Sequence, residues 1–356
     1  MYFYLSIYFI ISGFFIADIY LKFNKKRKDL ILISFFFLLL IFLGFRDKTG
    51  ADWDTYLHYY NLSDIRLLKL DNDILYYIFS LLIFNLDLGF HFIVFVVTLF
   101  FLISLFKYYS LYENQFLLLI ASFPVTIILL STGYIRQCIA FSFFLLFLHS
   151  IQKHKKFKYL YLFLGSLFHN SLFIFSIFFI SIYNKKEMFF FFKKYLFILL
   201  SIILLCFIFI FNFLPIQRYI DQYFLSSFVT SLEIYQIQDS PGLAYRLGII
   251  LISVIIFLAL YRKISFNNQE EKKVLMTLIQ ILLILLPLSG FSTTLFDRIF
   301  LYLSFLPGLL YIKIFNKFNF FYIKYGFLIF YGLLIVMWFK YSNHASYWLD
   351  YHSILF

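Results

Sequence analysis

The run LILISFFFLLLIFLGF, residues 30–45, leads directly into RDKTGADWDTY, residues 46–56. An apolar run of this kind forms a helix in a bilayer, because a helix satisfies its own backbone hydrogen bonds where water is absent. The charged residues that follow then lie where this helix leaves the membrane. The stretch predicts a membrane-spanning helix and raises the question of what its charged end binds.

The composition extends this prediction to the whole chain. Of its 356 residues, 63% are hydrophobic and only 13% are charged, and short basic gaps separate the apolar runs. These features are typical of an all-α polytopic membrane protein, so residues 1–356 are expected to form a single integral membrane domain. The net charge of +12 does not indicate nucleic-acid binding, because most lysines lie in those gaps. Strands are not expected.

Two observations concern processing and cofactors. The first apolar run, residues 2–21, has no preceding basic region and no small-residue cleavage site, so it is expected to be a retained span. Cys138 and Cys206 both lie inside apolar runs. No disulfide framework, zinc site or other cofactor is therefore expected.

The lysine-rich gaps predict which side of the membrane each loop faces, because cytoplasmic loops carry an excess of basic residues. This rule gives ten crossings, an N-terminus outside the cell, and outer loops at about 46–73 and 214–243. The expected crossings are residues 2–21, 30–45, 90–107, 116–131, 135–152, 195–213, 244–261, 273–290, 298–313 and 322–339.

Two further segments do not fit a simple crossing, and a third is the longest soluble stretch. Residues 74–87 are expected to form a re-entrant or interfacial helix on the outer side, because an extra crossing would break the parity of the topology. Residues 159–183 form either a helical hairpin with His169 at its polar tip, or one helix that breaks the positive-inside rule. Pro215–Gly242 is amphipathic and is either a lid over a site or an idle interfacial helix. The total is about 10–12 transmembrane helices.

Most arginines are predicted to lie on the outer side of the membrane, and most lysines on the cytoplasmic side. Six of the eight arginines fall on the outer side, and four of them lie at the outer ends of apolar runs. A positive charge there is costly near lipid, so an anion is expected to compensate it. The planar guanidinium suits forked recognition of phosphate or carboxylate. A phosphate or pyrophosphate carried on a lipid would supply that anion. In the alternative interpretation, each arginine pairs with a nearby acid such as Asp47 or Asp297, or extends its side chain to the lipid headgroups. The four are Arg46, Arg136, Arg246 and Arg298.

Asp52 and His169 are candidates for acid–base chemistry. A carboxylate or an imidazole can take the proton of a sugar hydroxyl, and the residues alone leave open which of the two does so. The pair Asp52 and Asp54 resembles a metal-binding DxD, but acids in an outer loop are usually only solvated, and no metal site is predicted. Trp53 and Tyr56 either stack on sugar rings or belong to the aromatic belt of a membrane interface.

Four short motifs are spread over much of the chain: Arg46 with Gly50, Asp52 and Tyr56; IRQCIAFSFF, from Ile135 to Phe144; FHNS, from Phe168 to Ser171; and Arg298 with Tyr302. Together, and in this order, they resemble the EpsG family and the wider Wzy-type polymerases of bacterial surface polysaccharides.

The resemblance implies a metal-independent membrane glycosyltransferase of GT-C-like architecture in the bacterial cytoplasmic membrane. Such an enzyme joins oligosaccharide units carried on undecaprenyl pyrophosphate at the outer face, and a chain-length regulator is an implied partner. Together with the arguments from the residues, it gives Asp52 or His169 the role of base. The expected substrate-binding residues are then Arg46, Arg136, Arg298 and Tyr56, and Arg246, which comes from the predicted topology and not from the family motif.

Three other classes of function stay open at this point. One is a non-catalytic subunit of polysaccharide assembly, because charge alone does not show turnover. A flippase or transporter of lipid-linked oligosaccharide would also place arginines in a membrane cavity, but it should show related halves and a site near the middle of the membrane. A membrane acyltransferase that uses His169 would need an acyl donor from the cytoplasm, whereas the other polar groups are predicted outside.

Overall fold

The apolar runs form helices in the computed structural model, which describes residues 1–62, 73–184, 242–266, 268–290, 293–318, 321–342, 345–349 and 351–355. Within these ranges, seven helices are long and apolar enough to cross a membrane. The chain is therefore an all-α polytopic membrane protein, as predicted. The expected crossing at 195–213 and nearly all of the amphipathic stretch 215–242 lie outside the described residues.

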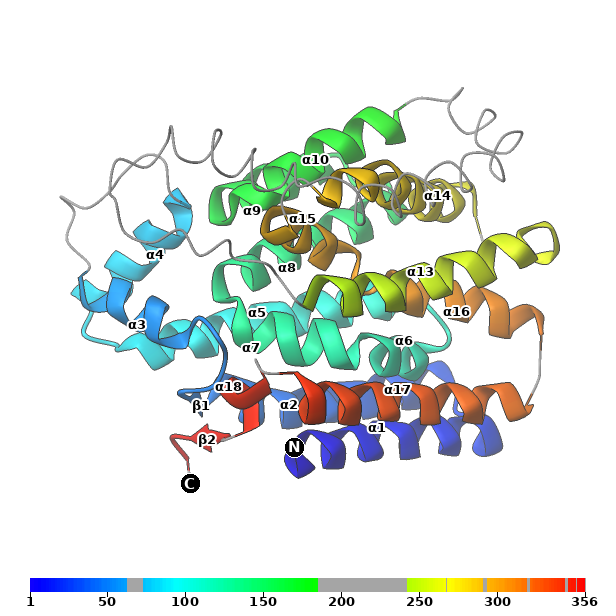
Figure 1. Cartoon of the computed structure of the whole chain (residues 1–356), viewed down its shortest axis with the longest axis horizontal. Helices are drawn as coiled ribbons and strands as arrows, with labels where there is room; N and C mark the ends of the chain where they lie inside the picture. The colour runs from blue at the N-terminus through cyan, green and yellow to red at the C-terminus, as the bar shows by residue number, and fades with distance from the viewer. Residues whose placement is uncertain are drawn as a thin grey trace.

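The other nine expected crossings each coincide with a helix or with a continuous series of helices (Figure 1). The helices are α1 (Tyr2–Leu21), α2 (Lys25–Gly44), α5 (Phe90–Tyr109), α6 (Gln115–Ser122), the π-helix η2 (Phe123–Leu130), α7 (Ser131–Gly133), α8 (Ile135–Gln152), α13 (Gly242–Leu260), α14 (Gln269–Leu285), α15 (Thr293–Phe300), the 3₁₀ turn η6 (Leu301–Leu303), α16 (Leu306–Lys317) and α17 (Phe321–Tyr341).

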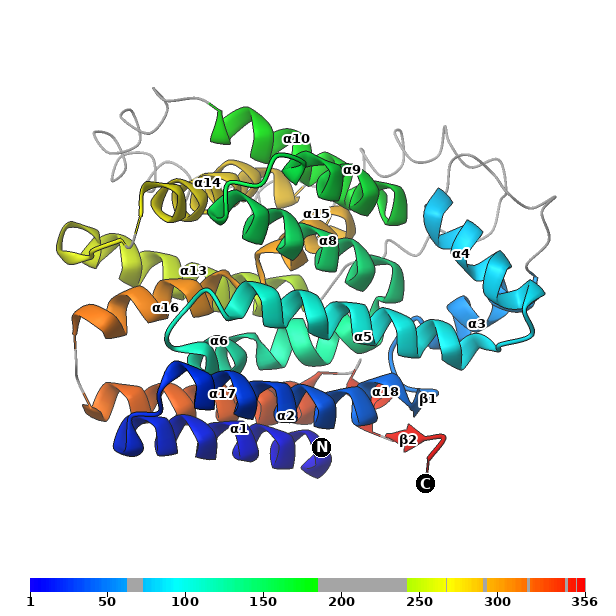
Figure 2. The same ribbon diagram turned by 180° about the vertical axis from the view of Figure 1, so that it is seen from behind.

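The span formed by α6, η2 and α7 is the centre of the bundle. Its residues, 115–133, are all buried inside the protein, and α1, α16 and α8 are among the helices that contact it. Pro124 lies at the start of η2, where a residue without an N–H is tolerated and the helix widens. Seen from behind, α2, α5, α8 and α9 (Lys158–Phe168) follow one another across the molecule (Figure 2).

Residues 158–183 form the predicted helical hairpin and not a single helix. The helix α9 ends at Phe168, His169 is extended with φ −160° and ψ 121°, and α10 runs from Asn170 to Tyr183. The ammonium of Lys158, at the start of α9, lies 5.9 Å from the ring centroid of Tyr183, so the two arms return to the same end. The segment expected to be re-entrant contains the short helix α4 (Ile74–Asn85).

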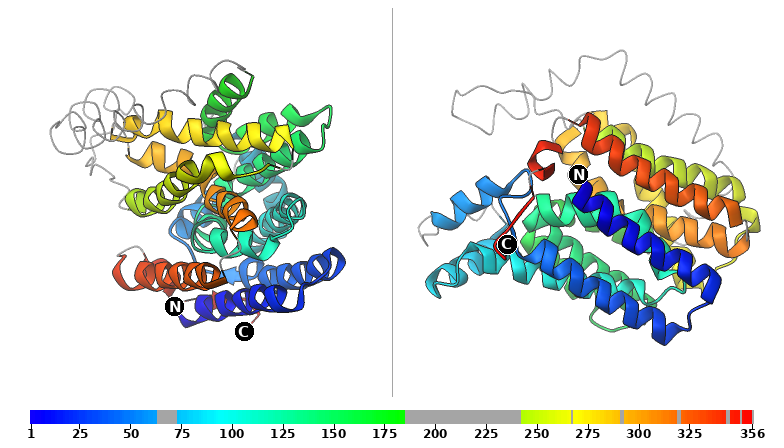
Figure 3. Two further views of the ribbon diagram at one scale, coloured as in Figure 1. Left: turned by 90° about the vertical axis from the view of Figure 1, so that its right-hand side faces the viewer. Right: turned by 90° about the horizontal axis from the view of Figure 1, so that it is seen from below.

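The two ends of the bundle differ in character. Basic turns meet at one end, where Lys28 donates to the backbone oxygen of Glu113 and Asn114 donates to Asn316. The opposite end holds both chain termini, α3 (Trp53–Asn61) and α18 (Ser346–Leu349), and the layer of α1, α2 and α17 runs between the two ends (Figure 3). The predicted sidedness of the loops therefore corresponds to two physical ends of the protein.

One small sheet corrects the prediction that the chain has no strands. β1 (Arg46–Asp47) pairs antiparallel with β2 (His352–Ser353), so that Arg46 lies opposite Ser353. Two backbone segments that leave helices at the same end satisfy each other's hydrogen-bonding groups in this way. The ladder ties the tail of the chain to the loop that follows α2.

A buried ion pair joins α14 to α16 near the basic end. The Lys313 ammonium lies 2.7 Å from the Glu271 carboxylate, and the two side chains are 2% and 3% exposed. Breaking such a pair from one side leaves a buried charge without its counter-charge. The Lys313→Met variant should therefore lose about 3–5 kcal/mol of stability, measured by thermal unfolding in detergent.

The double variant Lys313→Met with Glu271→Leu provides the matched control. It removes both charges and should recover most of the stability lost by Lys313→Met alone, because well-packed apolar residues commonly replace a buried ion pair without loss. A double variant as unstable as the single one would show that the pair is not what holds the two helices together.

Candidate functional site

The loop that follows α2 is held in place by Gly50. Its backbone has φ +113°, a conformation that favours glycine, and an added Cβ would lie 2.2 Å from the carbonyl oxygen of Thr132. Its N–H donates to the carbonyl of Tyr347 at 3.0 Å. This close approach of two backbones places Asp52 at the N-cap of α3, beside the junction of α7 and α8.

Asp52 and Tyr56 face the start of α8. Tyr56 lies one helical turn after Asp52, where its hydroxyl acts on the Asp52 carboxylate, and the ring of Tyr56 lies 5.3 Å from the guanidinium carbon of Arg136. Burial raises the pKa of Tyr56 to about 12, so the phenol keeps its proton at neutral pH and can donate to the carboxylate. Arg136 lies in the first turn of α8, where the unpaired backbone N–H groups favour a negatively charged group nearby.

Asp73 joins three elements of the site. Its carboxylate lies 3.0 Å from the Arg136 guanidinium and 3.4 Å from Nδ1 of His169. It also accepts the backbone N–H of Asn170, the first residue of α10, at 3.0 Å. Only 4% of the residue is exposed. The tip of the hairpin and the start of α8 are thus fixed to the residue that precedes α4.

Arg298 completes the group. It lies on α15, and its positive charge acts on Asp52, as does that of Arg136. Tyr302, one turn further on, shares a hydrogen bond of 3.1 Å with Ser171 of the hairpin. Within the described residues, the Arg298 guanidinium makes no hydrogen bond or ion pair, and Nε of Arg136 is buried with no hydrogen-bond partner. Both arginines therefore keep donors for a ligand.

The electrostatic environment distinguishes the two carboxylates. Burial raises the pKa of the Asp52 carboxyl above its usual range, against the opposing effect of the Arg298, Arg136 and His169 charges. Burial acts in the same direction on Asp73, but the hydrogen bond from His169 and the charges of His169 and Arg136 outweigh it, so the pKa of Asp73 is lowered. Asp73 is held as an anion, whereas Asp52 accepts a proton more readily.

Arg246 lies beside this group but is committed to another partner. Its Nε donates to the Asp297 carboxylate at 2.7 Å, and its terminal nitrogen donates to the second oxygen of the same carboxylate. Both side chains are almost fully buried. This forked pair holds α15 against α13, and Asp297 directly precedes Arg298. Arg246 therefore positions the segment that carries Arg298.

Arg46 is also separate from the group. It is 1% exposed, and its guanidinium donates to the carbonyls of Leu43, Ser131 and Thr132 and to the Thr98 hydroxyl. These acceptors lie on α2, α7 and α5, so Arg46 fastens three helices together. The structure thus brings together five of the predicted site residues and not the other two. The five are Asp52, Tyr56, Arg136, His169 and Arg298.

Two members of the site carried no signal of function in the sequence. Asp73 closes a polar stretch that reads as a solvated outer loop, and Tyr76, whose ring lies 6.0 Å from the Arg136 guanidinium, reads as part of the interfacial belt. Their partners come from other helices. As for metal binding, the part of the chain that the structure describes contains no group of three or more His, Cys, Asp or Glu residues arranged to hold an ion.

The arrangement combines cationic forks, a carboxylate of raised basicity and aromatic rings at one end of a membrane bundle. Comparison with known proteins agrees with this chemistry, because residues 29–353 match the model of the EpsG family. The chain belongs to the EpsG family. No curated protein and no solved structure matches it. Membership of the EpsG family supports a polysaccharide-polymerase-like role in the biosynthesis of surface polysaccharide, for a multi-pass bacterial membrane protein.

The contact at Gly50 predicts a substitution that disturbs the site of this EpsG protein from a distance. Gly50→Ala should displace the loop from Thr132 and move Asp52, so polysaccharide polymerisation and thermal stability should both fall. Gly89→Ala is the control, because Gly89 also has positive φ, at +77°, but an added Cβ there meets open space. It should lose only about 1–3 kcal/mol of stability and keep activity. Equal activity in both variants would contradict this role of Gly50.

Proposed function

We propose that the protein is a polymerase that joins oligosaccharide units carried on undecaprenyl pyrophosphate, at the outer face of the bacterial cytoplasmic membrane. One observation carries the proposal: two arginines with donors to spare converge with Asp52 and His169 at the end of the bundle opposite the basic turns. Membership of the EpsG family supports the sugar chemistry. The positive-inside rule supports the outer location, since it assigns the basic turns to the cytoplasm.

The arginines would bind the leaving group. In glycosyl transfer, the bond between the anomeric carbon and the pyrophosphate oxygen breaks, and the pyrophosphate leaves with the electron pair. Arg298 and Arg136 would hold that pyrophosphate and stabilise the charge that grows on it. Their positions are set in advance by the pairs Arg246 with Asp297 and Arg136 with Asp73. Donors that are already oriented need not reorganise when the bond breaks.

Asp52 is the better candidate for the base. It would take the proton of the acceptor hydroxyl as that oxygen forms the new bond to the anomeric carbon. Its pKa is raised by burial, which suits a proton acceptor. His169 is 8% exposed and is held through Nδ1 by Asp73, so it would orient the acceptor. Tyr56 and Tyr76 would line the approach of the sugars.

The location of the site favours this function over transport. A flippase or transporter would be expected to bind its substrate near the middle of the membrane, between related halves. Here Asp52, Asp73 and Arg136 all lie at element ends, at N-caps or in a first turn. A site of this kind serves chemistry at one face of the membrane.

Replacement of Arg298, whose guanidinium has no hydrogen-bond or ion-pair partner within the described residues, tests the pyrophosphate contact. Arg298→Lys keeps the charge but loses the fork, so it should lower polymerisation at least tenfold. The measurement is the length distribution of surface polysaccharide on gels, in cells whose chromosomal copy is deleted and replaced at matched membrane levels. Arg262→Lys is the control, because Arg262 is exposed in the basic turn after α13.

The same experiment separates the functions. A deletion that leaves single repeat units on the surface, with long chains restored by the wild type and Arg262→Lys but not by Arg298→Lys, supports the proposal. A deletion that removes even single units would favour transport. Unchanged chain length with altered acylation would favour an acyltransferase. Normal chains from Arg298→Lys would overturn the pyrophosphate contact.

The role of Asp52 predicts a pH dependence. A base must be deprotonated to act, so polymerisation should decline as the pH falls through the pKa of Asp52. Because that pKa is raised, the decline should begin above the range of an ordinary aspartate, about 4. Asp52→Asn should reduce the rate at least a hundredfold and abolish this limb of the profile.

Proteoliposomes supplied with lipid-linked repeat units allow the rate to be followed against pH. Asp54→Asn, which removes an exposed carboxylate two residues away, should behave like the wild type. His169→Gln should lower the rate and keep the limb. If His169→Gln removes the limb and Asp52→Asn keeps it, the histidine is the base instead.

A further inference from the structure

A polar pocket of about 230 Å³ opens at the basic end of the bundle, far from the site described above. Lys22, Lys28 and Lys324 line it, together with Asp18 and Asn114. These residues come from the end of α1, the start of α2, the turn before α6 and the start of α17. Three ammonium groups and one carboxylate give the pocket a net charge of +2, so it favours an anion.

Lys28 shows that the pocket is built and not only a patch of surface lysines. Its ammonium lies 2.8 Å from the Asp18 carboxylate and 3.2 Å from the carbonyl oxygen of Glu113. Asp18 is 8% exposed and also accepts the backbone N–H of Phe23 at 3.1 Å. An ammonium has three donors, so these two contacts orient Lys28 and leave one donor for a ligand.

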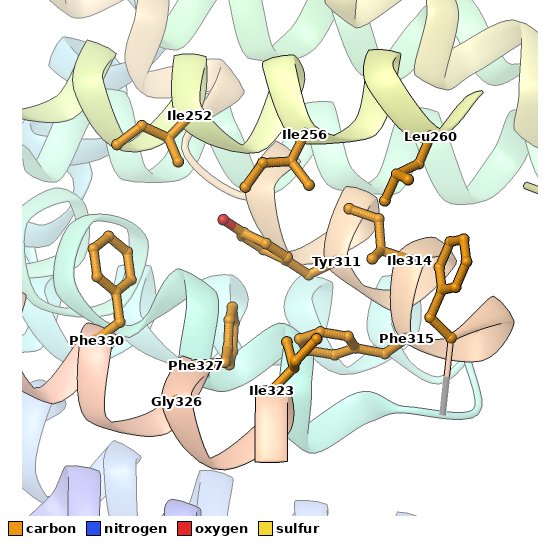
Figure 4. A pocket seen from close by; sticks show the side chains of 11 residues that line it. Ile252, Ile256, Leu260, Tyr311, Ile314, Phe315, Ile323, Gly326, Phe327 and Phe330 are labelled. Atoms are coloured by element: carbon orange, nitrogen blue, oxygen red, sulfur yellow. The ribbon is translucent and has the colours of Figure 1, made fainter. Parts of the chain in front are cut away.

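An apolar groove of about 580 Å³ lies beside this pocket. Figure 4 shows side chains of α13, among them Ile252 and Ile256, facing side chains of α16 and α17, among them Tyr311 and Phe327. Gly326 leaves room in the floor of the groove, because an added Cβ there would have no atom within 4 Å. The groove belongs to helices long and apolar enough to span the membrane, so it lies at the depth of lipid chains.

The pocket and the groove meet at one residue. Phe315 lines both of them, and Lys324 of the pocket directly follows Ile323 of the groove on α17. A ligand that fills both would carry an anionic group attached to an apolar chain. The basic turns place this end in the cytoplasmic leaflet, where anionic phospholipids concentrate and where basic pockets between helices bind their headgroups.

We propose that an anionic phospholipid of the inner leaflet binds here, with its phosphate among Lys22, Lys28 and Lys324 and an acyl chain in the groove between α13, α16 and α17. The bound lipid would connect α1 and α2 to α16 and α17. The site is independent of the polymerisation chemistry, and its ligand stays bound without reaction.

The test measures how added lipid shifts the melting temperature of the purified, delipidated protein in detergent. Phosphatidylglycerol should raise it, whereas phosphatidylcholine, which has the same chains and no net charge, and soluble glycerol 3-phosphate should not. An equal rise with phosphatidylcholine would overturn the role of the lysines. A rise with glycerol 3-phosphate alone would show a site for a free phosphate and overturn the lipid.

Two double variants test where the lipid headgroup binds. Lys22→Gln with Lys324→Gln leaves the pair of Lys28 with Asp18 intact and should raise the phosphatidylglycerol concentration for half the shift by roughly 30-fold, at about fivefold per lysine. The matched control is Lys153→Gln with Lys155→Gln, two exposed lysines of the turn between α8 and α9. Equal lipid affinity in the two double variants would overturn the headgroup site.

The groove has its own test. Gly326→Leu should fill the space and weaken phosphatidylglycerol binding. The control Gly13→Leu changes an exposed position on α1 where an added Cβ also meets open space. Equal binding by the two glycine variants would overturn the assignment of the acyl chain to the groove.

Discussion

The end of the bundle that holds the candidate site depends on the buried carboxylate of Asp73. A buried carboxylate is expensive unless several donors satisfy it together, and here the donors come from Arg136, His169 and the N–H of Asn170. Each belongs to a different position of the chain, at the start of α8 or at the bend of the hairpin. Because the single Asp73 carboxylate contacts these three donors at once, it fixes their positions relative to one another. The candidate site is the surface that this arrangement presents to Asp52.

The turn between the central span and α8 carries the contacts that complete the arrangement. Arg46 binds the carbonyls of Ser131 and Thr132, and Gly50 packs against the same Thr132 carbonyl. Arg136 follows four residues later. A short turn thus connects the loop of Asp52 to the hub at Asp73. Arg46 therefore has a structural role. Its guanidinium donates hydrogen bonds to backbone carbonyl oxygens, which lipid could not do.

Much of this was predictable from sequence because it depends on local patterns. Apolar runs predicted the helices, and the basic gaps on either side of residues 159–183 predicted the hairpin with His169 at its bend. What could not be predicted is which arginines are held by acceptors away from Asp52. Arg46 and Arg246 look like Arg136 and Arg298 in sequence, since each closes or opens an apolar run. Their acceptors, the carbonyls of α7 and the carboxylate of Asp297, come from distant segments. Asp73 was missed for the same reason, because only the fold turns an apparently solvated acid into a buried hub.

The separation of lysine from arginine then follows from what each end would bind. On the functions proposed above, the outer site holds a phosphate that gains charge as a bond breaks, so forked donors fixed in advance by Asp73 and Asp297 are an advantage. At the inner end a phospholipid would only have to stay, and the compact ammonium on its flexible stem is sufficient for that. Both ligands would carry a phosphate and a long apolar tail. Both ends would therefore recognise a phosphate. Guanidinium would be used where the charge of the bound phosphate increases during the reaction, and ammonium where that charge stays constant.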